Sequence, residues 1–319
     1  MSEPVSEQTL RLATRRSPLA RWQAEEVARL LRRVHPGLET VLVPVDTAGD
    51  RQKDRPLTEV GGQGVFVKEV QAAVLDGRAD LAVHSAKDLP SVATAGLALA
   101  AFPVRADPRD ALVGTPLARL ASGATVATGS VRRRAQLAWH RPDLRFTDLR
   151  GNIATRLERV PPSGAVVMAQ AALDRLGITG QVADALDNEV MLPQVGQGAM
   201  AVECRADDPA TVALLGAIDD PPTALAVRAE RGFLARLGSG CTLPAAAHAT
   251  VAIDGEAATI HIEGLIAATD GTALVRRGRS GTPGEAGTPE ALGAGLAESL
   301  LATPEGEALW AGESGRALP

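Results

Sequence analysis

Arginines are concentrated between residues 124 and 159, in the segment ATVATGSVRRRAQLAWHRPDLRFTDLRGNIATRLER. Two groups of them come directly after strand-like runs, at the points where helical patterns begin: TGSVRR at 128–133 and DLRGN at 148–152. The first turn of a helix presents unpaired N–H groups and a partial positive charge, so it binds anions. A guanidinium group adds a planar fork that holds two oxygens at once. The segment therefore predicts a site for carboxylates or phosphates.

Composition offers an alternative explanation for these arginines. Of 33 basic residues only three are lysines, and the chain is rich in alanine and glycine, as a GC-rich genome would produce without any functional reason. Composition alone leaves both explanations open. Placement at strand–helix junctions favours a binding role for Arg132, Arg133 and Arg150. The remaining arginines of this kind are expected on the surface: Arg16, Arg134, Arg141, Arg145 and Arg159.

Two further junctions carry polar groups. The strand pattern at 79–84 (ADLAVH) ends in SAKDLP, which places Lys87 beside Asp88. The carboxyl end of a strand is where α/β proteins hold reactive groups, although a solvated surface pair explains the same dipeptide. The strand pattern at 9–14 ends at Arg15, and Ser17 follows with a proline after it, which predicts the N-cap of a helix. A capping role alone explains Ser17.

The two cysteines lie in different settings. Cys241 lies within GSGCTLP at 238–244, where two glycines and a proline predict a bent loop. Cys204 lies in an apolar strand pattern and is expected in the core. Their spacing is not that of a metal site, so no metal is expected. Free thiols in a reducing cytoplasm are expected, because the first residues also contain no apolar signal core.

Overall composition excludes several protein classes. The chain has 319 residues, 45% of them hydrophobic and 2% aromatic, and a net charge of −5. A net negative charge and few aromatic residues disfavour a nucleic-acid binder. No apolar run approaches the length of a membrane span. Local basic clusters in an acidic chain instead suit a small anionic ligand.

The elements that must position these residues alternate between strand and helix, which predicts an α/β fold. Helices are expected at 19–34, 65–75, 170–176, 223–237 and 289–301, and strands at 9–14, 38–45, 79–84, 165–169, 199–203, 245–253, 259–267 and 273–279; residues 97–102 form a further apolar run. After residue 301 we expect a short tail. The polar, glycine-rich segment 46–64 is too long for a simple connection, so it is a candidate lid or a disordered excursion. The expected domains are 1–103 with 198–219, 104–197, and 220–319.

Eight strings in consistent order and spacing resemble the porphobilinogen deaminases, also called hydroxymethylbilane synthases: LRLATRRSPLARWQA (10–24), GGQGVFVKE (61–69), DLAVHSAKDLP (80–90), DPRDALV (107–113), SVRRRAQL (130–137), DLRGNIATRL (148–157), VGQGAMAVECR (195–205) and AERGFLARLGSGCTLP (229–244). The resemblance implies three domains. The first two would be α/β lobes like those of periplasmic anion-binding proteins, with a cleft between them, and the third a small α+β domain. It also implies a cytoplasmic monomer that takes part in porphyrin and haem biosynthesis.

The family resemblance also implies the chemistry. Four porphobilinogen units would be condensed onto a dipyrromethane cofactor joined to Cys241 by a thioether, with loss of ammonia through an azafulvene, and hydrolysis would release hydroxymethylbilane. By position in the matching strings, Asp88 would be the catalytic carboxylate. The cofactor would also be held by Lys87, Thr128, Ser130, Arg132, Arg133, Arg150 and Asp88. Substrate carboxylates would be bound by Arg15, Ser17, Arg150 and Arg156.

The chain departs from the family pattern at three positions. Lysines of some relatives are replaced here by Glu59 and Gln63, and a common serine is replaced by Gly129, so carboxylate contacts are expected to be fewer. A non-catalytic, two-lobed anion-binding module would suit the arginine junctions but does not require the Cys241 loop. A nucleic-acid binder is disfavoured by the charge.

Overall fold

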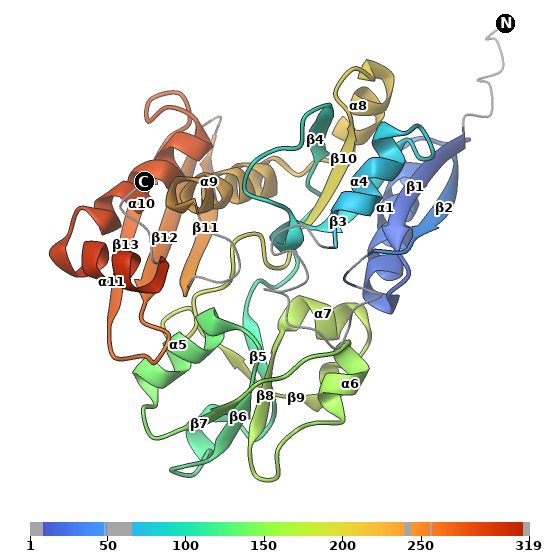
Figure 1. The fold of residues 1–319 in the computed structure, drawn as a ribbon. Coiled ribbons are helices and arrows are strands. Elements are labelled where there is room, and N and C mark those ends of the chain that lie inside the picture. The colour runs from blue at the N-terminus through green and yellow to red at the C-terminus, as the bar shows by residue number, and fades with distance from the viewer. Residues whose placement is uncertain (1–8, 48, 50–65, 239–243, 256, 315–319) are drawn as a thin grey trace, which may run out of the picture. The chain divides into compact units, whose positions relative to one another are not determined.

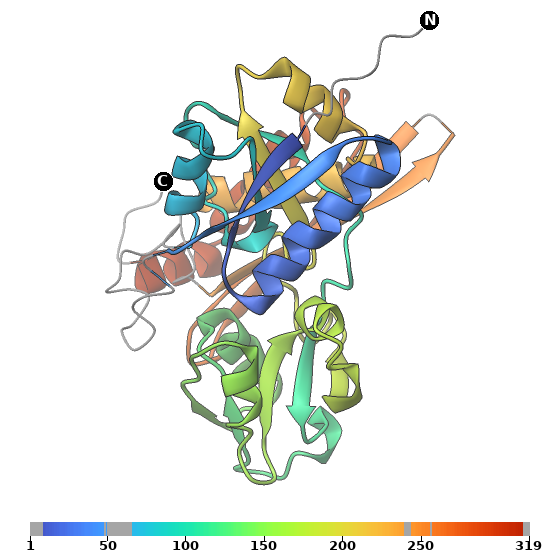
Figure 2. The same cartoon turned by 90° about the vertical axis from the view of Figure 1, so that its right-hand side faces the viewer.

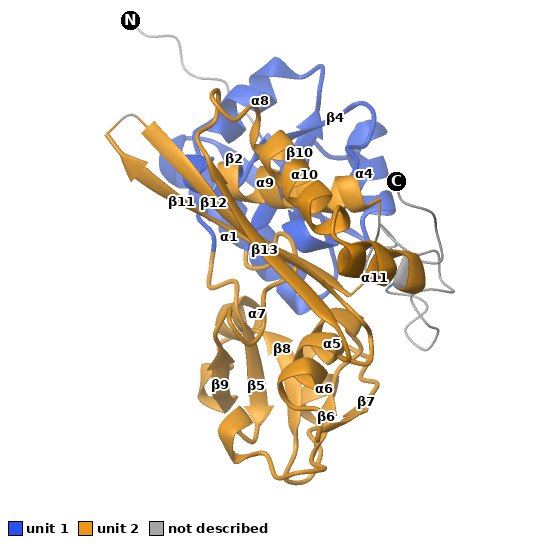
Figure 3. Ribbon diagram, turned by 90° about the vertical axis from the view of Figure 1, so that its left-hand side faces the viewer, with its two compact units in different colours: residues 1–105, 199–224 blue, residues 106–198, 225–319 orange. Residues whose placement is uncertain are grey.

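The computed structural model describes residues 9–47, 49, 66–238, 244–255 and 257–314. The chain divides into two compact units, Met1–Arg105 with Ala199–Ala224, and Ala106–Gly198 with Leu225–Pro319 (Figure 3). Two five-stranded sheets and one three-stranded sheet, each with helices, confirm the α/β class. The domain limits expected from the sequence remain a prediction.

Unit 1 is built on a mixed five-stranded sheet. Its strands are β1 (Thr9–Arg15), β2 (Glu39–Val45), β3 (Leu81–Ser85), β4 (Leu97–Ala101) and β10 (Met200–Arg205), in the order β2-β1-β3-β10-β4 (Figure 1). β1 is parallel to β2 and β3, whereas β10 is antiparallel to β3 and β4. The carboxyl ends of β1 and β3 therefore lie at the same edge, which brings Arg15 and Ser85 to one end of the sheet.

Helices cover both faces of this sheet because its strands are apolar on both sides. Helix α1 (Pro18–Val34) packs Ala24, Val27 and Leu31 against β1, β3 and β10, and Figure 2 shows it lying across one face. Helix α8 (Pro209–Gly216) adds Leu215 to that core. Helix α4 (Lys68–Leu75) packs Val70, Ala73 and Val74 on the other face.

Unit 2 begins with a second mixed sheet in the order β7-β6-β8-β5-β9. Its strands are β5 (Asp110–Gly114), β6 (Thr125–Ala127), β7 (Arg145–Thr147), β8 (Ala165–Ala169) and β9 (Val182–Leu186). Helix α5 (Val131–His140) packs Leu137 on one face, while α6 (Ile153–Leu157) and α7 (Gln170–Arg175) lie on the other. Because β6 and β7 are parallel, their carboxyl ends lead side by side into α5 and α6.

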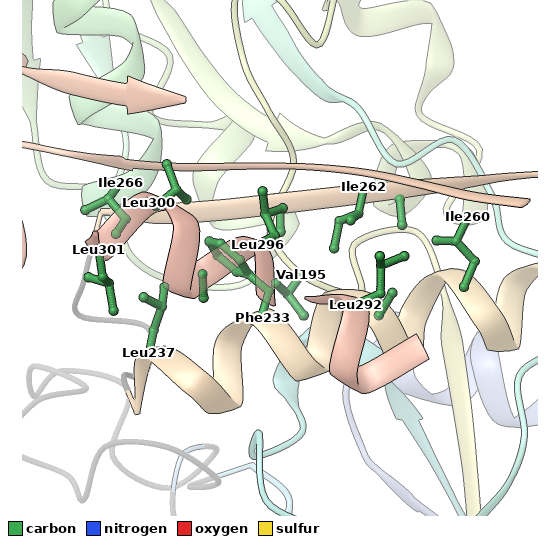
Figure 4. Close-up of a cluster of buried hydrophobic side chains, with 14 of the residues drawn as sticks. Val195, Phe233, Leu237, Ile260, Ile262, Ile266, Leu292, Leu296, Leu300 and Leu301 are labelled. Carbon is green, nitrogen blue, oxygen red and sulfur yellow. The ribbon is translucent and has the colours of Figure 1, made fainter. Parts of the chain in front are cut away.

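The third sheet is an antiparallel meander of β11 (Ala245–Asp254), β12 (Ala257–Ala267) and β13 (Leu274–Gly281). One face packs on α9 (Pro221–Leu237) and α10 (Pro289–Leu301) through a core around Phe233 and Leu296 (Figure 4). The other face meets α5, where Ala135 contacts Leu265 and Ala267. The small α+β region expected after residue 220 is thus confirmed as a sheet covered by helices.

Two glycines allow α9 and α10 to touch along their backbones. A Cβ atom on Gly293 would collide with the carbonyl oxygen of Ala229, and one on Gly232 with that of Glu290. Because neither glycine carries a side chain, the two helices pack closer than side chains would permit. The contact orients α9, whose C-terminal end leads toward the segment that contains Cys241.

One expectation about the C-terminus is wrong. In place of a short tail the chain forms a further helix, α11 (Pro304–Ser314). Trp310 on this helix is 2% exposed and joins the core of the third sheet. Hydrophobic burial explains the helix, since an exposed tail would leave this indole ring in water.

Arg141 is partly exposed, and its side chain also bonds neighbouring turns. Its side chain is 26% exposed and forms a bidentate ion pair with Asp143. It also donates to the carbonyl oxygens of Leu117 and Leu120, at 3.1 and 3.0 Å. Arg141 therefore holds together the turns around β6. Arg16, Arg145 and Arg159 are exposed as expected, and Arg134 is partly exposed, at 31% for its side chain.

Candidate active site

A pocket in unit 1 collects polar side chains at the carboxyl ends of β1 and β3. It is lined by apolar groups and by Arg15, Ser17, Gln23, His84, Ser85 and Asp88. The sequence placed three of these on two separate junctions, and the parallel pairing of β1 with β3 brings the junctions together. The pocket combines a cation, a helix N-terminus and a carboxylate.

The β1–α1 junction supplies the cationic part of this pocket. The Oγ atom of Ser17 accepts a hydrogen bond from the N–H of Ala20 at 3.3 Å, so Ser17 is the N-cap of α1 as expected. The guanidinium carbon of Arg15 lies 4.1 Å from the ring centroid of Phe66. Stacking on an aromatic face is a favourable position for a guanidinium group and limits its rotation.

Asp88 lies on a single 3₁₀ turn, Ala86–Asp88, that follows β3 directly. The turn is anchored because the N–H of Ala86 donates to the carbonyl oxygen of Ala199 at 3.0 Å. Asp88 and Lys87 are both half-buried, so the two side chains are not a freely solvated surface pair. A carboxylate held in this way can face a ligand while water is partly excluded.

Sequence reasoning missed the groups that line the pocket beside Asp88. Gln23 is 2% exposed and donates to the hydroxyl of Ser85 at 2.9 Å. The Nε2 atom of His84 lies 3.1 Å from Oε2 of Glu203, which also accepts from Gln71 at 2.8 Å. A signal was present, because a histidine, a glutamine and a glutamate inside apolar elements need partners when buried.

In unit 2 the β6–α5 junction carries Thr128 and Ser130. The Oγ1 atom of Thr128 accepts from the N–H of Ser130 at 3.2 Å, and Thr128 is 2% exposed. Ser130 caps α5, since its Oγ accepts from the N–H of Arg133 at 3.4 Å. The two hydroxyls therefore shape the turn that opens a ten-residue helix.

The β7–α6 junction lies directly against this turn. A Cβ atom on Gly129 would come within 2.6 Å of the carbonyl oxygen of Leu149. The glycine in place of a serine therefore has a steric reason here. At the second junction Arg150 is half-buried, and Nε of Arg156 donates to the carbonyl oxygen of Gly151 at 2.8 Å. Gly151 has a φ of +110°, which favours glycine.

Arg132 and Arg133 are buried inside unit 2, at 4% and 8% exposure, and share the carboxylate of Asp110. Nη2 of Arg132 lies 2.7 Å from Oδ2 of Asp110, and Nη2 of Arg133 lies 2.7 Å from Oδ1. Burial raises the pKa of Asp110, but the attraction of the two guanidinium groups outweighs it and holds the pKa at about 2. Sequence reasoning missed Asp110. Binding of ligand carboxylates by the two arginines remains a prediction.

The residues of unit 2 fit an acidic ligand such as the cofactor that the family resemblance implies. Nε of Arg132 is buried and has no hydrogen-bond partner among the described residues. Buried donors are normally satisfied, so this group can take a further acceptor. Cys241, the proposed attachment residue, lies outside the described residues, as do Glu59, Gln63 and nearly all of the lid candidate 46–64.

Cys204 is buried in β10, as expected, with no side-chain exposure, and is a free thiol. Burial raises its pKa to about 11. The thiolate is the reactive form of cysteine, so this thiol is unsuited to covalent chemistry. Within the described ranges there is no cluster of histidine, cysteine and acidic residues that could hold a metal ion. None of the described helices is long and apolar enough to cross a membrane.

Two family descriptions match consecutive parts of the chain. "Porphobilinogen deaminase, dipyromethane cofactor binding domain" matches residues 10–213, and "Porphobilinogen deaminase, C-terminal domain" matches residues 224–302. The chain belongs to the porphobilinogen deaminase family. A curated porphobilinogen deaminase of Syntrophotalea carbinolica is 48% identical over 303 residues, which cover 93% of this chain and 94% of the relative.

The solved structures found by the structural comparison are more distant in sequence. The methionine-binding protein MetQ is 12% identical, with a TM-score of 0.42, over 66% of this chain and 88% of MetQ. The effector-binding domain of BenM with benzoate is 12% identical, with a TM-score of 0.39, over 66% of this chain and 90% of that domain. Assignment to the porphobilinogen deaminases rests on the family match and on the curated relative.

Proposed function

We propose that this protein is a hydroxymethylbilane synthase, a transferase that joins four porphobilinogen units head to tail. In each cycle the aminomethyl nitrogen of one unit leaves as ammonia, a carbon–carbon bond forms to the free pyrrole α-carbon of the bound chain, and that carbon loses a proton. Water finally releases the linear tetrapyrrole. A dipyrromethane held on Cys241 by a thioether, when bound, supplies the first of these α-carbons. The observation that carries the proposal is the family match together with a half-buried Asp88 in a pocket beside Arg15 and Ser17.

Asp88 is proposed as the catalytic carboxylate. Loss of ammonia leaves an electron-poor carbon conjugated to the pyrrole, and a carboxylate beside it stabilises the positive charge that develops. The same group can accept the proton released after the bond forms. Partial burial strengthens both effects, because the effective dielectric constant falls as water is excluded.

The cations and caps are proposed to hold the acetate and propionate groups of the pyrroles. In unit 1 these are Arg15 and Ser17, together with Lys87, which neighbours Asp88. In unit 2 they are Thr128, Ser130, Arg132, Arg133, Arg150 and Arg156. Bidentate guanidinium–carboxylate pairs fix orientation as well as charge, so they would keep the growing chain in register.

We further propose that the enzyme works as a monomer in the cytoplasm. Formation of a thioether requires the sulfur of Cys241 in its reduced form. Cys204 is a free thiol, in keeping with a reducing compartment. Sedimentation or light scattering of the purified protein tests the monomer.

The test of the function is the intact mass of the denatured protein before and after brief incubation with porphobilinogen. We expect an adduct of two pyrrole units that survives denaturation and gains single further units with substrate. Cys241→Ser should carry no adduct, whereas Cys204→Ser should keep it. A folded protein whose mass never changes with substrate contradicts the proposal.

A further inference from the structure

The buried group formed by Asp110, Arg132 and Arg133 is incompletely paired. Asp110 is fully buried and accepts hydrogen bonds from Nη2 of Arg132 at 2.7 Å and from Nε of Arg133 at 2.9 Å. One carboxylate faces two guanidinium groups, so the group carries a formal charge of +1. Burying a net charge is unfavourable unless a counter-charge or dipoles compensate it.

Backbone dipoles satisfy only part of this excess charge. Nη1 of Arg132 donates to the carbonyl oxygen of Leu192 at 2.7 Å, and Nη1 of Arg133 donates to that of Val167 at 3.0 Å. Nε of Arg132 is left without an acceptor among the described residues. Burial lowers the pKa of the Arg132 guanidinium, and the attraction of Asp110 offsets this effect only in part.

A third side chain, that of Gln197, also holds the carboxylate of Asp110. Nε2 of Gln197 donates to Oδ1 of Asp110 at 3.0 Å and to the carbonyl oxygen of Pro108 at 2.8 Å. Gln197 is fully buried, and the next residue, Gly198, accepts from the N–H of Ala106 at 3.2 Å. The position of Asp110 is therefore fixed by three side chains and does not depend on any ligand.

We propose that Asp110 is a positioning residue that holds Arg132 and Arg133 as one guanidinium pair with unmet positive charge, and that a carboxylate of the bound pyrrole chain supplies the missing counter-charge. Asp110 is thus the permanent carboxylate partner of the two arginines, and a second carboxylate arrives with the ligand. The inference rests on the proposed function, because it takes the acidic ligand from there.

The inference predicts energetic coupling between Asp110 and the cofactor. We would measure the melting temperature of four proteins: wild type, Asp110→Asn, Cys241→Ser, and the double variant. Loading should raise the melting temperature of the wild type above that of Cys241→Ser, because a ligand stabilises the state that binds it. We call the difference in melting temperature between the protein with Cys241 and its Cys241→Ser counterpart the gap. In the Asp110→Asn background the gap should fall to less than half of its wild-type value, and intact mass should show a smaller fraction of protein that carries the cofactor.

A purely structural role gives a different result. If Asp110 only supports the fold, Asp110→Asn lowers the melting temperature equally with and without the cofactor, and the two changes add. An unchanged gap with an unchanged loaded fraction would overturn the inference. Asp143→Asn is the matched control, since it removes the carboxylate of another paired arginine in unit 2 and should leave the gap intact.

A second variant keeps the test decisive if Asp110→Asn does not fold. Gln197→Met removes one of the hydrogen bonds to Asp110 while preserving side-chain length. It should narrow the gap in the same direction by a smaller amount, and an unchanged gap again overturns the inference. Failure of the proposed function looks different, because the wild type itself would then carry no adduct and consume no porphobilinogen.

Discussion

Protonation of Asp110 is expected to weaken unit 2 in acid. Burial raises the pKa of this carboxyl, but Arg132 and Arg133 hold it at about 2 in the folded protein, below its ordinary value of 3.8. Since the pKa is depressed on folding, the stabilisation is complete above pH 3.8 and is lost as the pH falls through 2. A lowering of this size corresponds to about 2 kcal/mol in the free energy of unfolding.

The measurement compares wild type with Asp110→Asn in urea titrations at pH 7, 5 and 3. At pH 7 the substitution should cost about 3–5 kcal/mol, because it leaves two buried guanidinium groups without their carboxylate. This cost should be the same at pH 5. At pH 3 it should be smaller by about 1 kcal/mol, since part of the wild-type stabilisation has then been lost to protonation.

A difference between the two proteins that stays constant from pH 7 to pH 3 would refute the reasoning, since it would mean that Asp110 does not titrate as a paired buried carboxylate. Asp148→Asn is the control. The Asp148 side chain is 76% exposed and pairs with Arg134 on the surface. Exposed ion pairs contribute little, so this substitution should change stability by no more than about 1 kcal/mol at any of these pH values.

The other predictions concern catalysis, helix packing and thiol reactivity. Asp88→Asn should lower the rate of porphobilinogen consumption by roughly 10²–10⁴-fold with an unchanged circular dichroism spectrum, and a near-normal rate contradicts its catalytic role. Gly293→Ala should destabilise the protein by about 1–3 kcal/mol in urea, because the new methyl group meets the backbone of α9. Gly216→Ala, which has open space around it, should change stability by less than about 0.5 kcal/mol. With its pKa at about 11, the thiol of Cys204 should resist a disulfide reagent at pH 8 until the protein unfolds. The Cys241→Ser protein isolates this thiol, and its rapid labelling in the native state would show that Cys204 is not buried.

Local signals in the sequence were sufficient for most elements. The strand at 165–169 and the helix at 289–301 have the predicted bounds, because a short continuous apolar run, a capping threonine and a proline at the first helical position act over a few residues. Ser17 caps α1 for the same reason. The family resemblance then selected candidate site residues, and the parallel pairing of β1 and β3 explains why Arg15, Ser17 and Asp88 reach one pocket.

Helix α11 was missed although its signals were present. Pro304 stands at its first position with Glu305 and Glu307 in the first turn, and Thr303 accepts from the N–H of Gly306 at 3.0 Å. Burial of Trp310 decides the outcome, and burial is a tertiary effect that the sequence alone does not display.

Asp110 could not have been assigned from the sequence for a different reason. It lies 22 residues from Arg132 and 87 from Gln197, and these contacts depend on how β5, α5 and the segment before β10 pack. An aspartate in DPRDALV is typical of a turn or a solvated strand end. The placement of arginines at strand–helix junctions was visible, but whether each guanidinium group faces a ligand or an internal carboxylate was not.

The contact between Gly129 and Leu149 has a consequence for the kind of molecule that unit 2 can accept. The two turns that carry Ser130 and Arg150 touch through main-chain atoms, so the interval between them does not change when a side chain adopts another rotamer. A flexible pair of lysines would tolerate carboxylates at many separations. If Ser130 and Arg150 hold carboxylates as proposed, this fixed main-chain interval favours ligands whose acidic side chains have a matching spacing, and an analogue with side chains one methylene longer or shorter should bind more weakly.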